Sequence, residues 1–194
     1  MRRRLHLVLA ALVLAGCAPR PTPPSAAARL PGQGFTLAPP AGNGWIVGSA
    51  ARDRIVFTRA ASGAPAAFTA GAEVIADAAL AADLPQAARA WLAGRLQAPR
   101  RDTLGLDVRP AALHDAPCVA YDAAQVDRYE PGRVRPDHVD DRFEYAQHGL
   151  LCARGAVVVQ VFYNERFLRD GGARERVNDA EVRAFYEGLR WEDL

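Results

Sequence analysis

The densest group of metal-binding residue types in the sequence lies in a polar segment between residues 137 and 144. It consists of Asp137, His138, Asp140, Asp141 and Glu144. The spacing contains no pair of histidines one helical turn apart and no calcium-loop pattern with a central glycine. Three arginines lie beside these residues, Arg133, Arg135 and Arg142. We therefore expect a solvated loop over residues 127–142, with no bound metal and no cofactor.

Nucleophilic catalysis has little support in the residue pattern. The serines Ser25, Ser49 and Ser62 lie outside any Gly-x-Ser-x-Gly elbow. A constellation of Cys118, His114 and Asp115 would need a free, ionised thiol. A pair of carboxylates that includes Glu144 or Glu165 could hydrolyse glycosides only if the two carboxyl groups lay at a defined distance from each other. The sequence does not determine that distance. We assign no catalytic residue and do not expect an enzyme, although a hydrolase that uses carboxylates or a metal in the 127–142 loop stays open.

A polar cluster, Asn164, Glu165 and Arg166, follows directly after a strongly apolar segment. Binding residues are often found where a strand ends and a loop begins. We take this cluster as a candidate partner surface, together with three residues of the long loop, His138, Asp140 and Asp141. A salt-bridged turn is the alternative interpretation.

The first residues have the layout of a secretory signal. Arg2, Arg3 and Arg4 precede an apolar stretch, Leu5 to Leu14, and small residues follow. The stretch is too short to cross a bilayer core of about 30 Å, which needs roughly 20 residues of helix. We expect export.

Leu14-Ala15-Gly16-Cys17 closely resembles the lipobox of bacterial lipoproteins. The resemblance implies a signal peptide over residues 1–16 and acylation of Cys17 as the new first residue. Several acyl chains hold a protein firmly at a membrane. Ala18 stands where aspartate would mark retention at the inner membrane, so the resemblance implies the outer membrane, facing the periplasm, with the inner membrane as the alternative.

In an exported protein the two remaining cysteines, Cys118 and Cys152, predict a disulfide. In the chain-entropy account a bond closing this loop stabilises the fold by about 3 to 4 kcal/mol. A reactive Cys118 beside His114 is the alternative.

Charge excludes one class of partner. Removing the leader's three arginines lowers the formal net charge from +2 to −1, so a nucleic-acid partner is not expected. The sequence contains no lysine, which rules out Schiff-base chemistry and a phosphate-loop lysine.

The elements that would position these residues begin after a Pro- and Ala-rich tether, residues 17–34. The segment 35–194 predicts one α+β domain, a mostly antiparallel sheet with two main helices packed on it. One helix is expected over Leu84 to Leu96; the other is capped by Asn178 and carries Val182, Phe185, Tyr186 and Leu189. The expected strands are 35–37, 54–59, 67–75, 106–113, 117–126, 143–153 and 156–163.

The element order also resembles the Mog1/PsbP-like group. A short strand and a proline loop precede Gly44-Trp45, and a helix, a meander, a valine-rich strand and a closing helix follow. The resemblance spans about residues 35 to 191 and implies a binding or assembly module without a shared catalytic site. We therefore expect a non-enzymatic envelope lipoprotein that binds an envelope protein or component, with a small-ligand carrier as an alternative.

Overall fold

The computed structural model describes residues 28–60, 67–99, 101–127, 143–169 and 179–192. Its strands are β1 (Leu30–Pro31), β2 (Phe35–Leu37), β3 (Ile46–Ala51), β4 (Arg54–Ala60), β5 (Ala67–Ile75), β6 (Arg101–Leu113), β7 (Ala116–Asp127), β8 (Phe143–Arg154), β9 (Val157–Leu168) and β10 (Leu189–Trp191). Its helices are α1 (Ala78–Ala82), α2 (Leu84–Leu96) and α3 (Asp179–Glu187).

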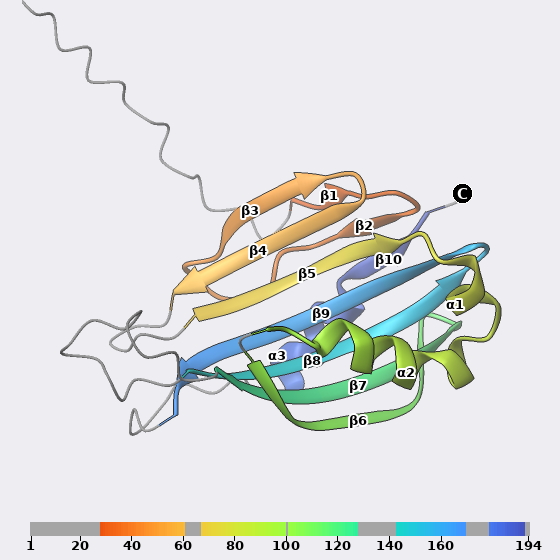
Figure 1. Cartoon of the computed structure of the whole chain (residues 1–194). Coiled ribbons are helices and arrows are strands. Elements are labelled where there is room, and N and C mark those ends of the chain that lie inside the picture. The colour runs from red at the N-terminus through yellow and green to blue at the C-terminus, as the bar shows by residue number, and fades with distance from the viewer. Residues whose placement is uncertain (1–27, 61–66, 100, 128–142, 170–178, 193–194) are drawn as a thin grey trace, which may run out of the picture.

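Two antiparallel sheets organise the chain (Figure 1). The larger has seven strands in the order β3-β4-β5-β9-β8-β7-β6, and the smaller has the order β1-β2-β10. Helices α1 and α2 lie on one face of the large sheet, and the small sheet and α3 lie on the other. We call these the α2 face and the α3 face.

The predicted α+β class with two main helices is wrong, because strands make up most of the described residues. Among the helices of the described ranges, only α2 is longer than nine residues. Several strands continue past the end of their apolar pattern. β9 runs on to Leu168 because hydrogen bonds to β5 and β8 on both sides pair its polar residues as well. The prediction had one sheet, and the structure has a second one with the order β1-β2-β10.

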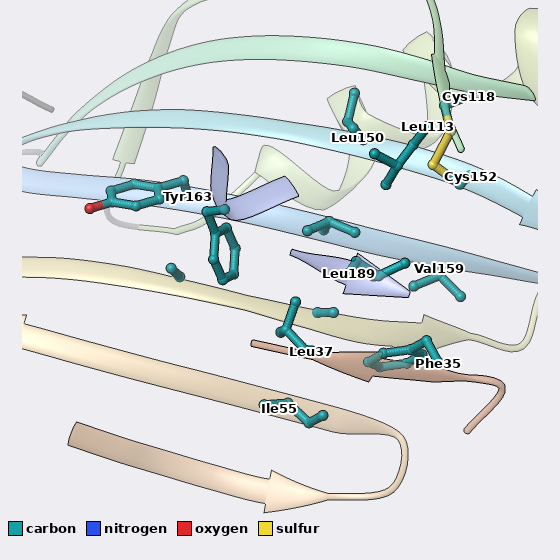
Figure 2. Close-up of a cluster of buried hydrophobic side chains, with 14 of the residues drawn as sticks. Phe35, Leu37, Ile55, Leu113, Cys118, Leu150, Cys152, Val159, Tyr163 and Leu189 are labelled. Atoms are coloured by element: carbon teal, nitrogen blue, oxygen red, sulfur yellow. A yellow bond between two sulfur atoms is a disulfide. The ribbon is translucent and has the colours of Figure 1, made fainter. Parts of the chain in front are cut away.

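The core has two parts, one on each face. The α3-face core joins the two sheets through Phe35, Leu37, Ile55 and Leu189 (Figure 2), all fully buried. Val161 of β9 is also fully buried in this core. The α2-face core packs a helical stripe of Leu80, Leu84, Ala88 and Leu92 on β7, β8 and β9. β9 is apolar on both faces in its first half because both faces are covered there. Trp91 of α2 is only half-buried.

The predicted disulfide is present. Cys118 on β7 lies opposite Cys152 on β8, and the two are bonded with their Cα atoms 4.1 Å apart. Both residues are buried in the α3-face core. A free, reactive Cys118 is therefore excluded.

The C-terminal residues differ from the sequence prediction at Leu189. It was expected on the closing helix, but α3 ends at Glu187 and Leu189 begins β10, where it pairs with Leu37. At the other end, Leu30 and Pro31 fall within the predicted tether and pair with β2.

The predicted leader, Cys17 and the helix cap Asn178 lie outside the described residues. Within the described ranges no helix is both long enough and apolar enough to cross a bilayer.

Candidate functional site

The α2 face changes from apolar to polar along its length. Near α1 it presents Val158, Leu151 and Val119 to the helices. Two to six residues further along the same strands, on the same face, it presents amide side chains: Gln160 and Asn164 on β9, Gln147 on β8 and Gln125 on β7. Covered sheet faces are usually apolar, so this polar end of the α2 face is a candidate for a site.

A pocket of about 240 Å³ lies between this polar end and the C-terminal half of α2. We call it the amide pocket. Its lining from the central strands is Tyr121, Gln125, Gln147, Gln160 and Asn164. Its lining from α2, the following turn and the first residue of β6 is Leu92, Arg95, Leu96, Ala98 and Arg101.

Two of the amides are held in place by a chain of hydrogen bonds. Gln147 donates from Nε2 to Oε1 of Gln125 at 2.7 Å, and Gln125 donates from Nε2 to the backbone carbonyl of Leu96 at 2.7 Å. Leu96 is the last residue of α2, whose final carbonyls have no partner within the helix. Gln125, only 2% exposed, therefore ties the helix end to the sheet and fixes one wall of the pocket.

The other two amides carry unsatisfied atoms. The side-chain oxygens of Gln160 and Asn164 are buried and have no hydrogen-bond partner among the described residues. Gln160 uses its other end to donate from Nε2 to the Tyr121 hydroxyl. A buried polar atom without a partner costs about 1 to 3 kcal/mol, so these two oxygens are places where a ligand's donor would be favourable.

Tyr121 remains a neutral phenol throughout the physiological pH range. Its ring lies in the α2-face core, and burial raises the pKa of its hydroxyl to about 12, although the hydrogen bond from Gln160 acts in the opposite direction. It therefore serves the pocket as a hydrogen-bonding group and not as a charge.

The arginines at the pocket already have carboxylate partners. Arg95 pairs with Glu73, and Arg101 pairs with Asp127 at 3.6 Å. Each guanidinium also stacks on an aromatic ring, Arg95 on Trp91 at 5.1 Å and Arg101 on Tyr145 at 3.8 Å. In the described part of the pocket, the charge of each of these two arginines is therefore balanced by a carboxylate.

A second cleft lies on the opposite face of the sheet, beneath α3. Its volume is about 360 Å³, and we call it the α3 cleft. Arg109, Asp122 and His148 line it from the sheet, with Ala120 and Leu150 as apolar floor, and the helix contributes Asp179, Val182, Arg183 and Tyr186.

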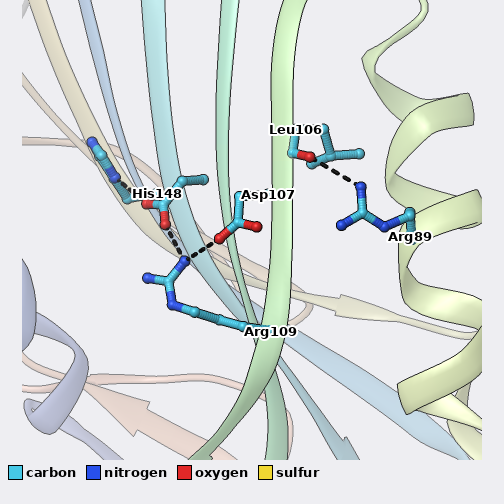
Figure 3. A network of polar contacts seen from close by, with 6 residues as sticks. Arg89, Leu106, Asp107, Arg109 and His148 are labelled. Atoms are coloured by element: carbon cyan, nitrogen blue, oxygen red, sulfur yellow. Dashed lines mark hydrogen bonds and ion pairs between the residues drawn. The ribbon is translucent and has the colours of Figure 1, made fainter.

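The polar side chains of the α3 cleft form a ladder across β6, β7 and β8. Asp122 accepts from His148, with Nδ1 and Oδ1 2.6 Å apart, and its other oxygen accepts from Arg109. Arg109 also donates to Asp107 at 3.0 Å, as the dashed lines of Figure 3 show. Partial burial pushes the pKa of Asp122 upward, but the hydrogen bonds and charges of His148 and Arg109 outweigh it and hold that pKa below its usual value.

The structure separates the residues of the predicted partner surface. Asn164 and Arg166 lie on the α2 face within β9 and not in a turn; Asn164 lines the amide pocket, and the exposed Arg166 stacks on Phe143 at 3.5 Å. Glu165 is buried, and its side chain lies on the other face. His138, Asp140 and Asp141 lie outside the described residues.

The other candidates from the sequence are not brought together as a site. Glu144 lies on β8 and pairs with Arg169 at 3.3 Å, and His114 contacts Arg190 at 2.8 Å in the β6–β7 turn. Among the described residues no group of three or more His, Cys, Asp or Glu side chains could hold a metal ion.

The amide pocket was not predicted from the sequence. The available signal was Gln160, a single amide inside a run of valines that we assigned to a buried central strand. Gln125 and Gln147 are 22 residues apart, and only the β7–β8 register brings them into contact.

Comparisons with known proteins identify no family. No protein-family model matches the chain, and no curated protein matches it. Among solved structures, a STAR-related lipid transfer protein from Xanthomonas axonopodis is similar with a TM-score of 0.30 and 15% sequence identity, over 74% of this chain and 89% of that chain. At this TM-score the likeness says nothing about the fold or the ligand of this chain.

Proposed function

We propose that this chain is a lipid-anchored binding protein of the cell envelope that holds a small neutral ligand in the amide pocket. The observation that carries the proposal is the pair of buried, unpartnered side-chain oxygens of Gln160 and Asn164 in the pocket wall. Buried polar groups in folded proteins are nearly always hydrogen-bonded, so an unpaired pair beside a pocket calls for a partner.

The chemistry of the pocket limits the ligand class. Two orphan acceptors require a ligand with O–H or N–H donors, and the balanced charges of Arg95 and Arg101 favour a neutral one. The volume of about 240 Å³ is below the range of roughly 300 to 1,000 Å³ typical of pockets for drug-sized molecules. Small hydroxyl-rich compounds such as monosaccharides, and small primary amides, fit this description.

Replacing Asn164 by leucine tests the ligand proposal. The orphan oxygen disappears, so we expect the free energy of unfolding to stay within about 0.5 kcal/mol or to rise by up to about 1 kcal/mol. Ligand affinity should fall at least about tenfold, the cost of one lost hydrogen bond in a buried site. Urea unfolding measures the first quantity, and NMR titration with a panel of neutral monosaccharides and small amides measures the second.

Gln86→Leu is the matched control, since Gln86 is an exposed amide on α2 remote from the pocket lining. It should leave the affinity of any compound that binds unchanged. If no member of the panel binds the unmodified protein, or if Asn164→Leu binds as tightly as the parent, the proposal fails.

Membrane attachment is proposed on the lipobox-like residues that end at Cys17. Intact mass of the native protein should correspond to a chain starting at Cys17 with added acyl chains, found in the membrane fraction. Cys17→Ser should remove the acyl mass and release the protein from that fraction. Native protein with its leader intact and no acyl mass would contradict the proposed membrane attachment. It would leave the proposal of ligand binding in the amide pocket unaffected.

A further inference from the structure

The hydrogen bonds of the α3 cleft fix which nitrogen of His148 carries hydrogen. Asp122 is ionised at neutral pH, because its pKa lies below the usual value. A carboxylate has no hydrogen to donate, so the 2.6 Å contact requires the hydrogen to be on Nδ1 of His148. Nε2 of the neutral ring therefore carries a lone pair, and no contact of this nitrogen with a described residue occupies it.

This arrangement suits a general base. A carboxylate behind the ring holds its orientation and stabilises the imidazolium that forms when Nε2 takes a proton. Arg109 holds Asp122 from the other side, so the acceptor stays in place. The charged groups around the ring are Asp107 and Arg109 on β6, Asp122 on β7, and Asp179 and Arg183 on α3. Their formal charges sum to one negative charge.

Tyr186 provides a hydrogen-bond donor in the same cleft. Its hydroxyl oxygen is buried and has no partner among the described residues. Burial raises the pKa of this hydroxyl well above its ordinary value, with a further contribution from Tyr121 and Asp122, so it keeps its hydrogen. A neutral, unpaired phenol can donate to a developing oxyanion.

We propose that the α3 cleft is a hydrolytic site for small carboxylic esters, with His148 as the general base. His148 Nε2 takes a proton from a water molecule, whose oxygen attacks the ester carbonyl carbon, and Tyr186 donates a hydrogen bond to the resulting oxyanion. The tetrahedral intermediate reforms the carbonyl and expels the alkoxide, which recovers the proton from Nε2. The products are one carboxylic acid and one alcohol, and the side chains return to their starting state.

The cleft also indicates the kind of ester. Ala120, Leu150 and Val182 give it an apolar lining beside the polar groups, and its volume of about 360 Å³ admits a short acyl chain or a single aromatic ring. Asp122 and Arg109 act through His148 and are positioning residues.

Steady-state hydrolysis of 4-nitrophenyl acetate and 4-nitrophenyl butyrate by the purified full-length protein tests the proposal. We expect kcat/KM to fall about 100-fold or more in His148→Gln, since general-base catalysis contributes roughly 10² to 10⁴. Asp122→Asn should also lower kcat, because the amide can turn its NH₂ toward the ring and reverse the tautomer. Tyr186→Phe should lower kcat while KM stays within about twofold, because the donor acts on the transition state.

His114→Gln is the matched control, as His114 lies in the β6–β7 turn and contacts Arg190 and the Glu187 carbonyl. It should retain the full rate. Diethyl pyrocarbonate treatment of the folded parent gives a test that needs no variant: loss of activity should follow modification of His148, mapped by mass spectrometry.

Three results would each overturn the proposal: a parent rate equal to buffer, a His148→Gln rate equal to the parent, or rates insensitive to both Asp122→Asn and Tyr186→Phe. The last result would mean that His148 reacts as any exposed histidine does, with no contribution from Asp122 or Tyr186. None of these outcomes bears on ligand binding in the amide pocket, which lies on the other face of the sheet.

Discussion

Gly149 determines where the side chain of Tyr121 can lie. The two residues are opposite each other on β8 and β7, and a Cβ on Gly149 would come within 2.4 Å of the tyrosine ring. The ring can therefore cross β8 and bring its hydroxyl to Gln160 on β9. One glycine thus allows a contact between strands that are not neighbours, and that contact occupies one end of the Gln160 amide.

Asp122 should make the stability of the protein depend on acid. Because its folded pKa lies below the usual 3.8, its interactions contribute in full above the unfolded pKa and are lost as pH falls through the folded value. Comparing the parent with Asp122→Asn in urea at pH values from 2.5 to 7 isolates this contribution, since the variant lacks the titrating group.

The difference in free energy of unfolding between parent and variant should be constant above about pH 5 and should shrink below about pH 4. Asp107→Asn offers a comparison, because Asp107 contacts the same arginine from a more exposed position. A parent–variant difference that does not change with pH would show that Asp122 stabilises the fold without its charge.

At the scale of elements, local patterns predicted some segments with their boundaries and placed the ends of others wrongly. β2, β5 and α2 have the predicted boundaries because apolar period, turn residues and a proline at the helix start all agree there. β6 begins five residues earlier than predicted, at Arg101, since an edge strand tolerates charged side chains and even Pro110. Composition alone could not show where β6 begins, because its pairing with β7 determines that boundary.

The candidate sites depend on register, which a single sequence does not determine. Gln125, Gln147 and Asn164 meet because β7, β8 and β9 align in one particular way, and a shift by one residue would move each side chain to the other face. The same holds for Asp122 and His148. The disulfide could be predicted because only two cysteines remained to pair.

The bond between Cys118 and Cys152 should contribute substantially to stability. It links β7 to β8 across a sequence separation of 34, for which the chain-entropy account gives about 3 to 4 kcal/mol. The double variant Cys118→Ala, Cys152→Ala should lose about that amount in urea unfolding. Dithiothreitol should lower the unfolding midpoint of the parent and leave that of the variant unchanged; equal midpoints for oxidised parent and variant would contradict the account.

At the scale of the whole molecule, the large sheet separates two clefts of different chemistry. The amide pocket offers neutral hydrogen-bonding groups beneath α2, and the α3 cleft offers a charged ladder beneath α3. Each depends on a short element packed on the sheet: α2 is tied down by Gln125, and α3 is followed directly by β10. The position of α3 on the sheet therefore depends on the pairing of β10 with β2.

The C-terminal strand joins the two ends of the described chain. β10 pairs with β2, which also pairs with β1, and Leu189 lies fully buried opposite Leu37 (Figure 2). Trp191 adds a hydrogen bond from Nε1 to the Leu113 carbonyl at 3.2 Å, which ties β10 to the end of β6. The small sheet thus closes the α3-face core.

Truncating Leu189 to alanine should therefore weaken the whole fold and not only its C-terminal end. We expect the free energy of unfolding to fall by about 2 to 5 kcal/mol, the usual cost of a large-to-small change at a fully buried leucine. Arg190→Ala, one residue on and exposed, should cost less than about 1 kcal/mol. Urea unfolding followed by both tryptophan fluorescence and circular dichroism should give a single coincident transition; two separate transitions, or equal losses in the two variants, would show that β10 frays independently of the core.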